Sequence, residues 1–257
     1  MNSRAKKLLL TTGSVCLLAS LFLWHYVVAG KTHPTHSVVL RDPSASVRSG
    51  CDCTSALITR AFTDPKVGPG STVTFTITGD ASTANEARVI ASVEVPTSRQ
   101  VMQGREGAAK QRDKLISEIN ADCAKVVPTK SSPIFLALAR AVQHLRNLGC
   151  RPTSGCTVYA QTDLEENAEQ HIKHILDGAA SVKEALPPPI DNTGINVVIT
   201  GIADTVGATS QPGVGKHLTR PRTTDRAERI RSVWERLFTD RQRLVFEPYC
   251  LAAKPVN

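Results

Sequence analysis

The chain has 257 residues, of which 41% are apolar, enough for one sizeable hydrophobic core. Aromatic residues make up only 4%, so Val, Ile, Leu and Ala must build that core. The net charge of +8 is modest, and three of the cations, Arg4, Lys6 and Lys7, precede the first apolar segment. Without interleaved aromatics or a recognition-helix signature, this composition speaks against nucleic-acid binding.

The first segment of the chain has the pattern of a membrane anchor. About twenty mostly apolar residues follow the cations, enough to cross a bilayer as a helix. Trp24 and Tyr26 lie near its far end, where amphipathic rings favour the interface. Under the positive-inside rule we expect a cytoplasmic N-terminus at 1–7, a transmembrane signal anchor at 8–30, a linker at 31–36 and a domain at 37–257 in the periplasm or extracellular space. A cleaved signal peptide is the alternative, and the sequence does not decide between them.

Strand and helix patterns alternate along the rest of the chain. Strands are expected at 37–41, 71–80, 87–96, 156–163, 195–203 and 243–249. Helices are expected at 51–62, about 100–123, 131–149, 164–186 and 225–238. Within 131–149, Ser132 can cap the helix, Pro133 suits its first position and Gly149 its end. This order predicts an α/β fold: a doubly wound, mostly parallel sheet with one antiparallel edge strand, at 87–96, and helices on both faces.

Oxygen-bearing side chains follow the first strand and end another. In "SVVLRDPSAS", Asp42, Ser44 and Ser46 occupy every second position after a β-branched run, and Asp163 ends "CTVYAQTD". In the common doubly wound strand order these two strands are neighbours where the order reverses, which is where ligands bind. Two carboxylates brought together would repel each other unless a cation lay between them. Such an all-oxygen set suits Mg²⁺, with Mn²⁺ or Ca²⁺ as alternatives.

Residues 36–250 resemble a von Willebrand factor A-type (vWA) domain. Its metal-ion-dependent adhesion site (MIDAS) begins with Asp-x-Ser-x-Ser after the first strand, present here as Asp42-Pro43-Ser44-Ala45-Ser46. The resemblance implies two further ligands: a hydroxyl before a mid-domain helix, for which Ser132 is the candidate and Thr129 the reserve, and Asp163 in "QTDLEEN". Leu164 stands where the family pattern has Gly, and Glu165 and Glu166 add negative charge. The implied metal ligands are therefore Asp42, Ser44, Ser46, Ser132 and Asp163.

The resemblance also implies a function. In such domains the side chains leave one coordination position open, and an Asp or Glu carboxylate of a protein partner completes the shell. We therefore expect a membrane-anchored, extracytoplasmic protein-binding domain that is not an enzyme. A Mg²⁺-dependent hydrolase on a similar sheet, which would need a nucleophile or general base beside the metal, is one alternative. Glu165 and Glu166 could serve as acid and base, but adjacent residues on one helix point in different directions. A structural subunit of an envelope assembly with a lapsed metal site is another.

Cysteine usage agrees with an oxidising compartment. Six cysteines follow the apolar segment, an even number that predicts disulfides. Cys150 and Cys156 flank a short turn and form the best local pair. The sequence leaves the other pairings open, among Cys51, Cys53, Cys123 and Cys250. It also leaves open the partner, the process and the oligomeric state.

Overall fold

The computed structural model describes residues 34–44, 47, 50–68, 70–79, 87–95, 104–123, 132–166, 168–178, 186–202 and 224–247. The chain divides into two compact units, Met1–His33 and Pro34–Asn257. The first unit, with the expected segments 1–7 and 8–30, lies outside the described residues. All that follows concerns the second.

A six-stranded sheet forms the centre of this unit. Its strands are β1 (Ser37–Arg41), β2 (Thr72–Thr78), β3 (Ala87–Glu94), β4 (Thr157–Gln161), β5 (Asn196–Thr200) and β6 (Leu244–Glu247). They lie in the order β3-β2-β1-β4-β5-β6, and β3 alone runs antiparallel to its neighbour. The predicted α/β class, the mostly parallel sheet and the antiparallel edge strand are confirmed. The strand order reverses between β1 and β4, which are parallel neighbours, so their carboxyl ends lie side by side.

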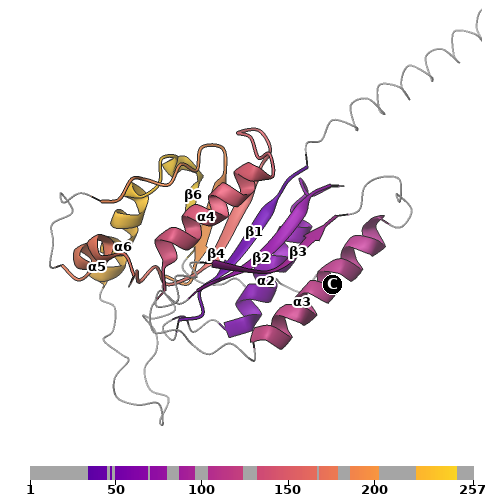
Figure 1. Ribbon diagram of the computed structural model, residues 1–257, viewed down its shortest axis with the longest axis horizontal. Coiled ribbons are helices and arrows are strands. Elements are labelled where there is room, and N and C mark those ends of the chain that lie inside the picture. The colour runs from indigo at the N-terminus through magenta and orange to yellow at the C-terminus, as the bar shows by residue number, and fades with distance from the viewer. Residues whose placement is uncertain are drawn as a thin grey trace, which may run out of the picture. The chain divides into compact units, whose positions relative to one another are not determined.

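Helices cover both faces of the sheet, as Figure 1 shows. On one face lie α2 (Gly50–Thr63) and α3 (Gly104–Cys123), which enclose an apolar cluster with Val39, Phe75 and Tyr159. On the other lie α4 (Ile134–Asn147), α5 (Gln170–Leu176) and α6 (Thr224–Arg236), around a larger cluster that includes Leu40 and Trp234. Because β1 has helices on both sides, Val38, Val39 and Leu40 are all buried, which explains its uninterrupted apolar run.

The edge strand β3 pairs with β2 through an irregular register. Phe75 pairs with Ala91, whereas the next residue of β2, Thr76, pairs with Val89. One residue of β3, Ile90, is therefore extra, which is the count of a β-bulge. Bulges of this kind occur often at sheet edges, where they twist the strand and disturb further pairing.

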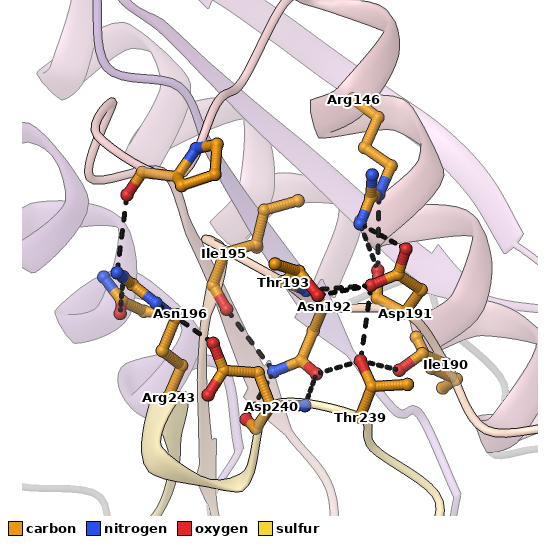
Figure 2. Close-up of polar contacts among 11 residues, drawn as sticks. Arg146, Ile190, Asp191, Asn192, Thr193, Ile195, Asn196, Thr239, Asp240 and Arg243 are labelled. Carbon is orange, nitrogen blue, oxygen red and sulfur yellow. Dashed lines mark hydrogen bonds and ion pairs between the residues drawn. The ribbon is translucent and has the colours of Figure 1, made fainter.

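A polar network holds the amino end of β5, opposite the ends of β1 and β4 where ligand residues were predicted (Figure 2). The fully buried Asn192 donates from Nδ2 to the Asp240 carbonyl (2.9 Å) and accepts at Oδ1 from the Asp240 amide (2.8 Å). Arg146 of α4 forms an ion pair with Asp191 (2.9 Å). The network joins the turn before β5 to the 3₁₀ helix Arg241–Arg243 that leads into β6.

Two helix predictions need correction. The helix expected at 164–186 is described only as α5, Gln170–Leu176, because residues 162–166 form a turn in which side chains accept backbone N–H groups. Ser132 does not cap α4: the cap position is Pro133, without a side-chain hydrogen bond. The hydroxyl of Ser132 bonds instead to Asp42.

The expectation of a transmembrane helix finds no support in the described residues, and the expected span at 8–30 lies outside them. Among the helices that the structure describes, none is long and apolar enough to cross a membrane. The predicted disulfide between Cys150 and Cys156 is confirmed.

Candidate functional site

The carboxylate of Asp42 is the centre of the candidate site. Asp42 directly follows β1, and its backbone N–H donates to the Gln161 carbonyl at the end of β4 (2.9 Å). This bond continues the ladder between β1 and β4 and fixes the residue at the point where the strand order reverses. The side chain is only 1% exposed. A charged group is thus held in the interior at the position where such sheets bind ligands.

Hydrogen-bond donors from three segments reach the two oxygens of this carboxylate. Oδ1 accepts from the Ser44 amide (2.9 Å) and from the Ser132 hydroxyl (2.7 Å). Oδ2 accepts from the Thr162 hydroxyl (3.0 Å). Each bond favours the ionised form, but burial, and then the charge of Asp163, raise the pKa of Asp42 above its ordinary value. The site thus concentrates negative charge that its hydroxyls only partly offset.

Four of the five predicted ligand residues lie in the described part of the chain. The structure brings Asp42, Ser44 and Ser132 into hydrogen-bonding contact, and the charge of Asp163 acts on Asp42. The Ser44 contact is made by its backbone. Ser46 lies outside the described residues, as does Thr129, the reserve for Ser132.

Thr162 is a member of the site that the sequence analysis missed. Besides donating to Asp42, its Oγ1 accepts from the Leu164 amide (3.0 Å). The next residue, Asp163, is 1% exposed, and its Oδ1 accepts from the Glu165 amide (3.0 Å). Thr162 follows Gln161, which is the in-register partner of Arg41, just as Asp42 follows Arg41. Register, which the sequence did not supply, places Thr162 next to Asp42.

Leu164 occupies a backbone conformation that favours glycine. Among the described residues it is the one non-glycine residue with a positive φ, +60°. In this left-handed region a side chain crowds the backbone, whereas glycine has no side chain to do so. The Leu164 side chain is fully buried in the larger cluster, and its carbonyl accepts from the Trp234 indole (3.0 Å). Core packing and α6 therefore hold the turn that carries Asp163.

Glu165 and Glu166 have structural partners. Glu165 makes two hydrogen bonds of 2.9 Å with the Arg226 guanidinium of α6. Glu166 is 1% exposed and accepts from the amide of Phe135 in the first turn of α4 (2.7 Å) and from two amides of its own loop. Burial raises the pKa of Glu166, which these bonds oppose. Neither arrangement matches the acid–base pair of the hydrolase alternative.

The predicted metal centre consists of two acids and three hydroxyls, Asp42, Asp163, Ser44, Ser46 and Ser132. Within the described ranges, no three side chains of the His, Cys, Asp and Glu types are grouped so as to hold a metal ion. Glu165 and Glu166 turn toward α6 and α4. The acids that remain are Asp42 and Asp163, with the hydroxyls of Ser132 and Thr162 against Asp42. This set is hard and all-oxygen, which fits Mg²⁺ better than a softer metal.

Comparison with known proteins adds no assignment. No protein-family model matches the chain, and no curated protein matches it.

Proposed function

We propose that this chain is a vWA-like protein-binding domain that takes up a divalent cation, with Mg²⁺ first, beside Asp42 and Asp163. The cation would present an open coordination position to an Asp or Glu carboxylate of a protein partner. The observation that carries the proposal is the buried Asp42 carboxylate, which receives two hydroxyls from separate segments while the charge of Asp163 opposes its ionisation. A dication beside two ionised acids removes that opposition.

The residues of the chain have distinct roles in this proposal. Asp42 and Asp163 supply the negative charge, and Ser44, Ser46 and Ser132 supply the remaining protein ligands. Thr162 positions Asp42 through its hydrogen bond to Oδ2. When bound, the cation supplies an electrophilic centre that a carboxylate can ligate, so the function we infer is binding rather than catalysis. The confirmed disulfide favours a location in an oxidising compartment outside the cytoplasm.

The test is calorimetric titration with Mg²⁺ and with Mn²⁺. Three full-length proteins are titrated: the parent, Asp42→Asn and Asp163→Asn. The matched control is Asp113→Asn, because Asp113 is an exposed acid on α3 outside the site. We expect saturable binding in the parent and the control and at least a tenfold weaker affinity in both site variants.

A thermal-denaturation series gives an independent readout. At a cation concentration of about 100 times Kd, binding to the folded state adds roughly 2.7 kcal/mol to stability. Parent and Asp113→Asn should gain this stabilisation, and Asp42→Asn should not. Absence of saturable binding in the parent, or equal binding in Asp42→Asn, would refute the cation-dependent function.

A further inference from the structure

The first turn of α2 carries two cysteines whose bonding partners we infer from its surroundings. Cys51 and Cys53 are each disulfide-bonded. Cys150 and Cys156 bond to each other. Of the six cysteines after residue 30, only Cys123 and Cys250 then remain, and four cysteines allow three pairings. The side chain of Cys123 and the whole of Cys250 lie outside the described part, whereas residues near both in the sequence lie within it.

One side of α2 faces α3. Ser55 of α2 donates from its hydroxyl to Oδ1 of Asn120 on α3 (3.0 Å). Cys51 lies four residues before Ser55, and residues four apart occupy the same face of a helix one turn away. Cys123, the last residue of α3, lies three residues after Asn120 and so belongs to the same face of that helix.

The directions of the two helices bring these positions together. α2 packs on β1, β2 and β4, while α3 packs on α2 and β3. The Ser55–Asn120 bond joins the early part of α2 to the late part of α3. Because α2 connects the parallel strands β1 and β2, it runs against them; α3 follows β3, which is antiparallel to β2, and so runs opposite to α2. One turn toward the start of α2 and one turn toward the end of α3 therefore lead in the same direction. The two turns reached in this way carry Cys51 and Cys123.

Cys53 faces the other way. Two residues correspond to about 200° around a helix, so Cys53 and Ser55 point to nearly opposite sides. The Sγ atom of Cys53 lies 3.8 Å from Oγ1 of Thr200, the last residue of β5. Thr200 pairs in register with Glu247, the last residue of β6. Arg60, two turns after Cys53 on the same side of α2, forms an ion pair with Glu247 (2.8 Å).

Cys250 follows Glu247 by three residues, a span of about 10 Å when extended. The side of α2 that carries Cys53 therefore faces the strand from which Cys250 continues. We propose that the disulfides are Cys51–Cys123 and Cys53–Cys250. Both would hold the start of α2, the helix that directly follows the loop after Asp42, from opposite sides.

A non-reducing peptide map of the full chain tests this connectivity. Trypsin alone leaves Cys51 and Cys53 on one peptide, 49–60, so cleavage before Asp52 must be added to separate them. With Asp-N protease and trypsin together, the proposal predicts that the peptide ending at Cys51 is linked to the peptide containing Cys123. It predicts that the peptide 52–60 is linked to the peptide beginning at Leu244. A link from Cys51 to Cys250, to Cys53 or to Cys16 would overturn the proposal.

Paired serine variants give a second readout that does not depend on digestion. In Cys51→Ser/Cys123→Ser a complete bond is removed, so the count of free thiols in the denatured, unreduced protein should equal that of the parent. In the matched control Cys51→Ser/Cys250→Ser each bond loses one partner, so two additional thiols should appear. The reverse pattern would overturn the proposal even if one of the variants were less stable.

Discussion

Leu164 provides a prediction in which backbone strain and core packing can be separated. The residue is fully buried and has a φ of +60°, next to Asp163 of the site. Replacing a buried Leu by Ala costs about 2–5 kcal/mol in general. A left-handed conformation costs an L-residue roughly 1–2 kcal/mol, which only glycine escapes. The step from Ala to Gly at this position should therefore release strain.

Leu138 is the matched control, because it is equally buried in the same cluster but lies within α4. In a helix the step from Ala to Gly costs about 1 kcal/mol. That helix penalty is mainly the greater freedom of glycine in the unfolded chain, which applies equally at residue 164. We therefore expect the step from Leu164→Ala to Leu164→Gly to cost about 1–2 kcal/mol less than the step from Leu138→Ala to Leu138→Gly. Urea unfolding followed by far-ultraviolet circular dichroism, with disulfides intact, measures all four variants. Equal steps at the two positions would show that Leu164 carries no strain.

Three further predictions concern stability. Asn192→Ala should cost about 1–3 kcal/mol in urea unfolding, because the amide and carbonyl of Asp240 lose their partners; an unchanged midpoint would contradict this. Trp234→Phe should lower the free energy of unfolding by about 1–3 kcal/mol, because the hydrogen bond from the indole to the Leu164 carbonyl is lost. If this hydrogen bond positions the turn that carries Asp163, the affinity for Mg²⁺ should decrease as well. Burial, and then His144, lower the pKa of His36 below 6.5, although Glu94 opposes this. As pH falls, His36 takes up a proton in the unfolded chain before it does so in the folded protein, so the free energy of unfolding should decrease from about pH 6.5 down through the folded-state pKa. In His36→Gln this decrease should be smaller. If the parent and the variant show parallel pH profiles, His36 is not its cause.

The fold was predictable because burial leaves a strong mark on this sequence. Each of three sequence patterns formed an element close to its expected place: the apolar runs at 37–41 and 195–203 and the glycine-terminated helix pattern at 131–149. The prediction of a helix from residue 164 was wrong at its start. Helix propensity does not account for side-chain hydrogen bonds, and here oxygens of Thr162, Asp163 and Glu166 accept from backbone amides of the same loop.

The site was predictable to the extent that it depends on strand ends. Asp42 was identified from its place after β1 and Asp163 from the end of the β4 segment, and the structure relates them electrostatically. The roles of Ser132 and Thr162 depend on tertiary contacts. The sequence pattern suggests a helix cap for Ser132 and a strand residue for Thr162, yet both hydroxyls bond to Asp42. Periodicity cannot supply such contacts, because they join residues 90 and 120 positions apart.

The bulge in β3 determines how this edge of the sheet meets other molecules. In an unbroken strand Arg88 and Glu94, six residues apart, would point to the same face. Because of the extra residue, Arg88 pairs with Ile77 and Glu94 pairs with Thr72. Ile77 and Thr72 are five residues apart in β2 and point to opposite faces, so Arg88 and Glu94 do so as well. Each face of the exposed edge thus carries one charge, and no straight strand can match the hydrogen bonds on both sides of the bulge. The bulge therefore interrupts the row of edge hydrogen-bonding groups near its middle, and we expect this to disfavour edge-to-edge pairing with another sheet.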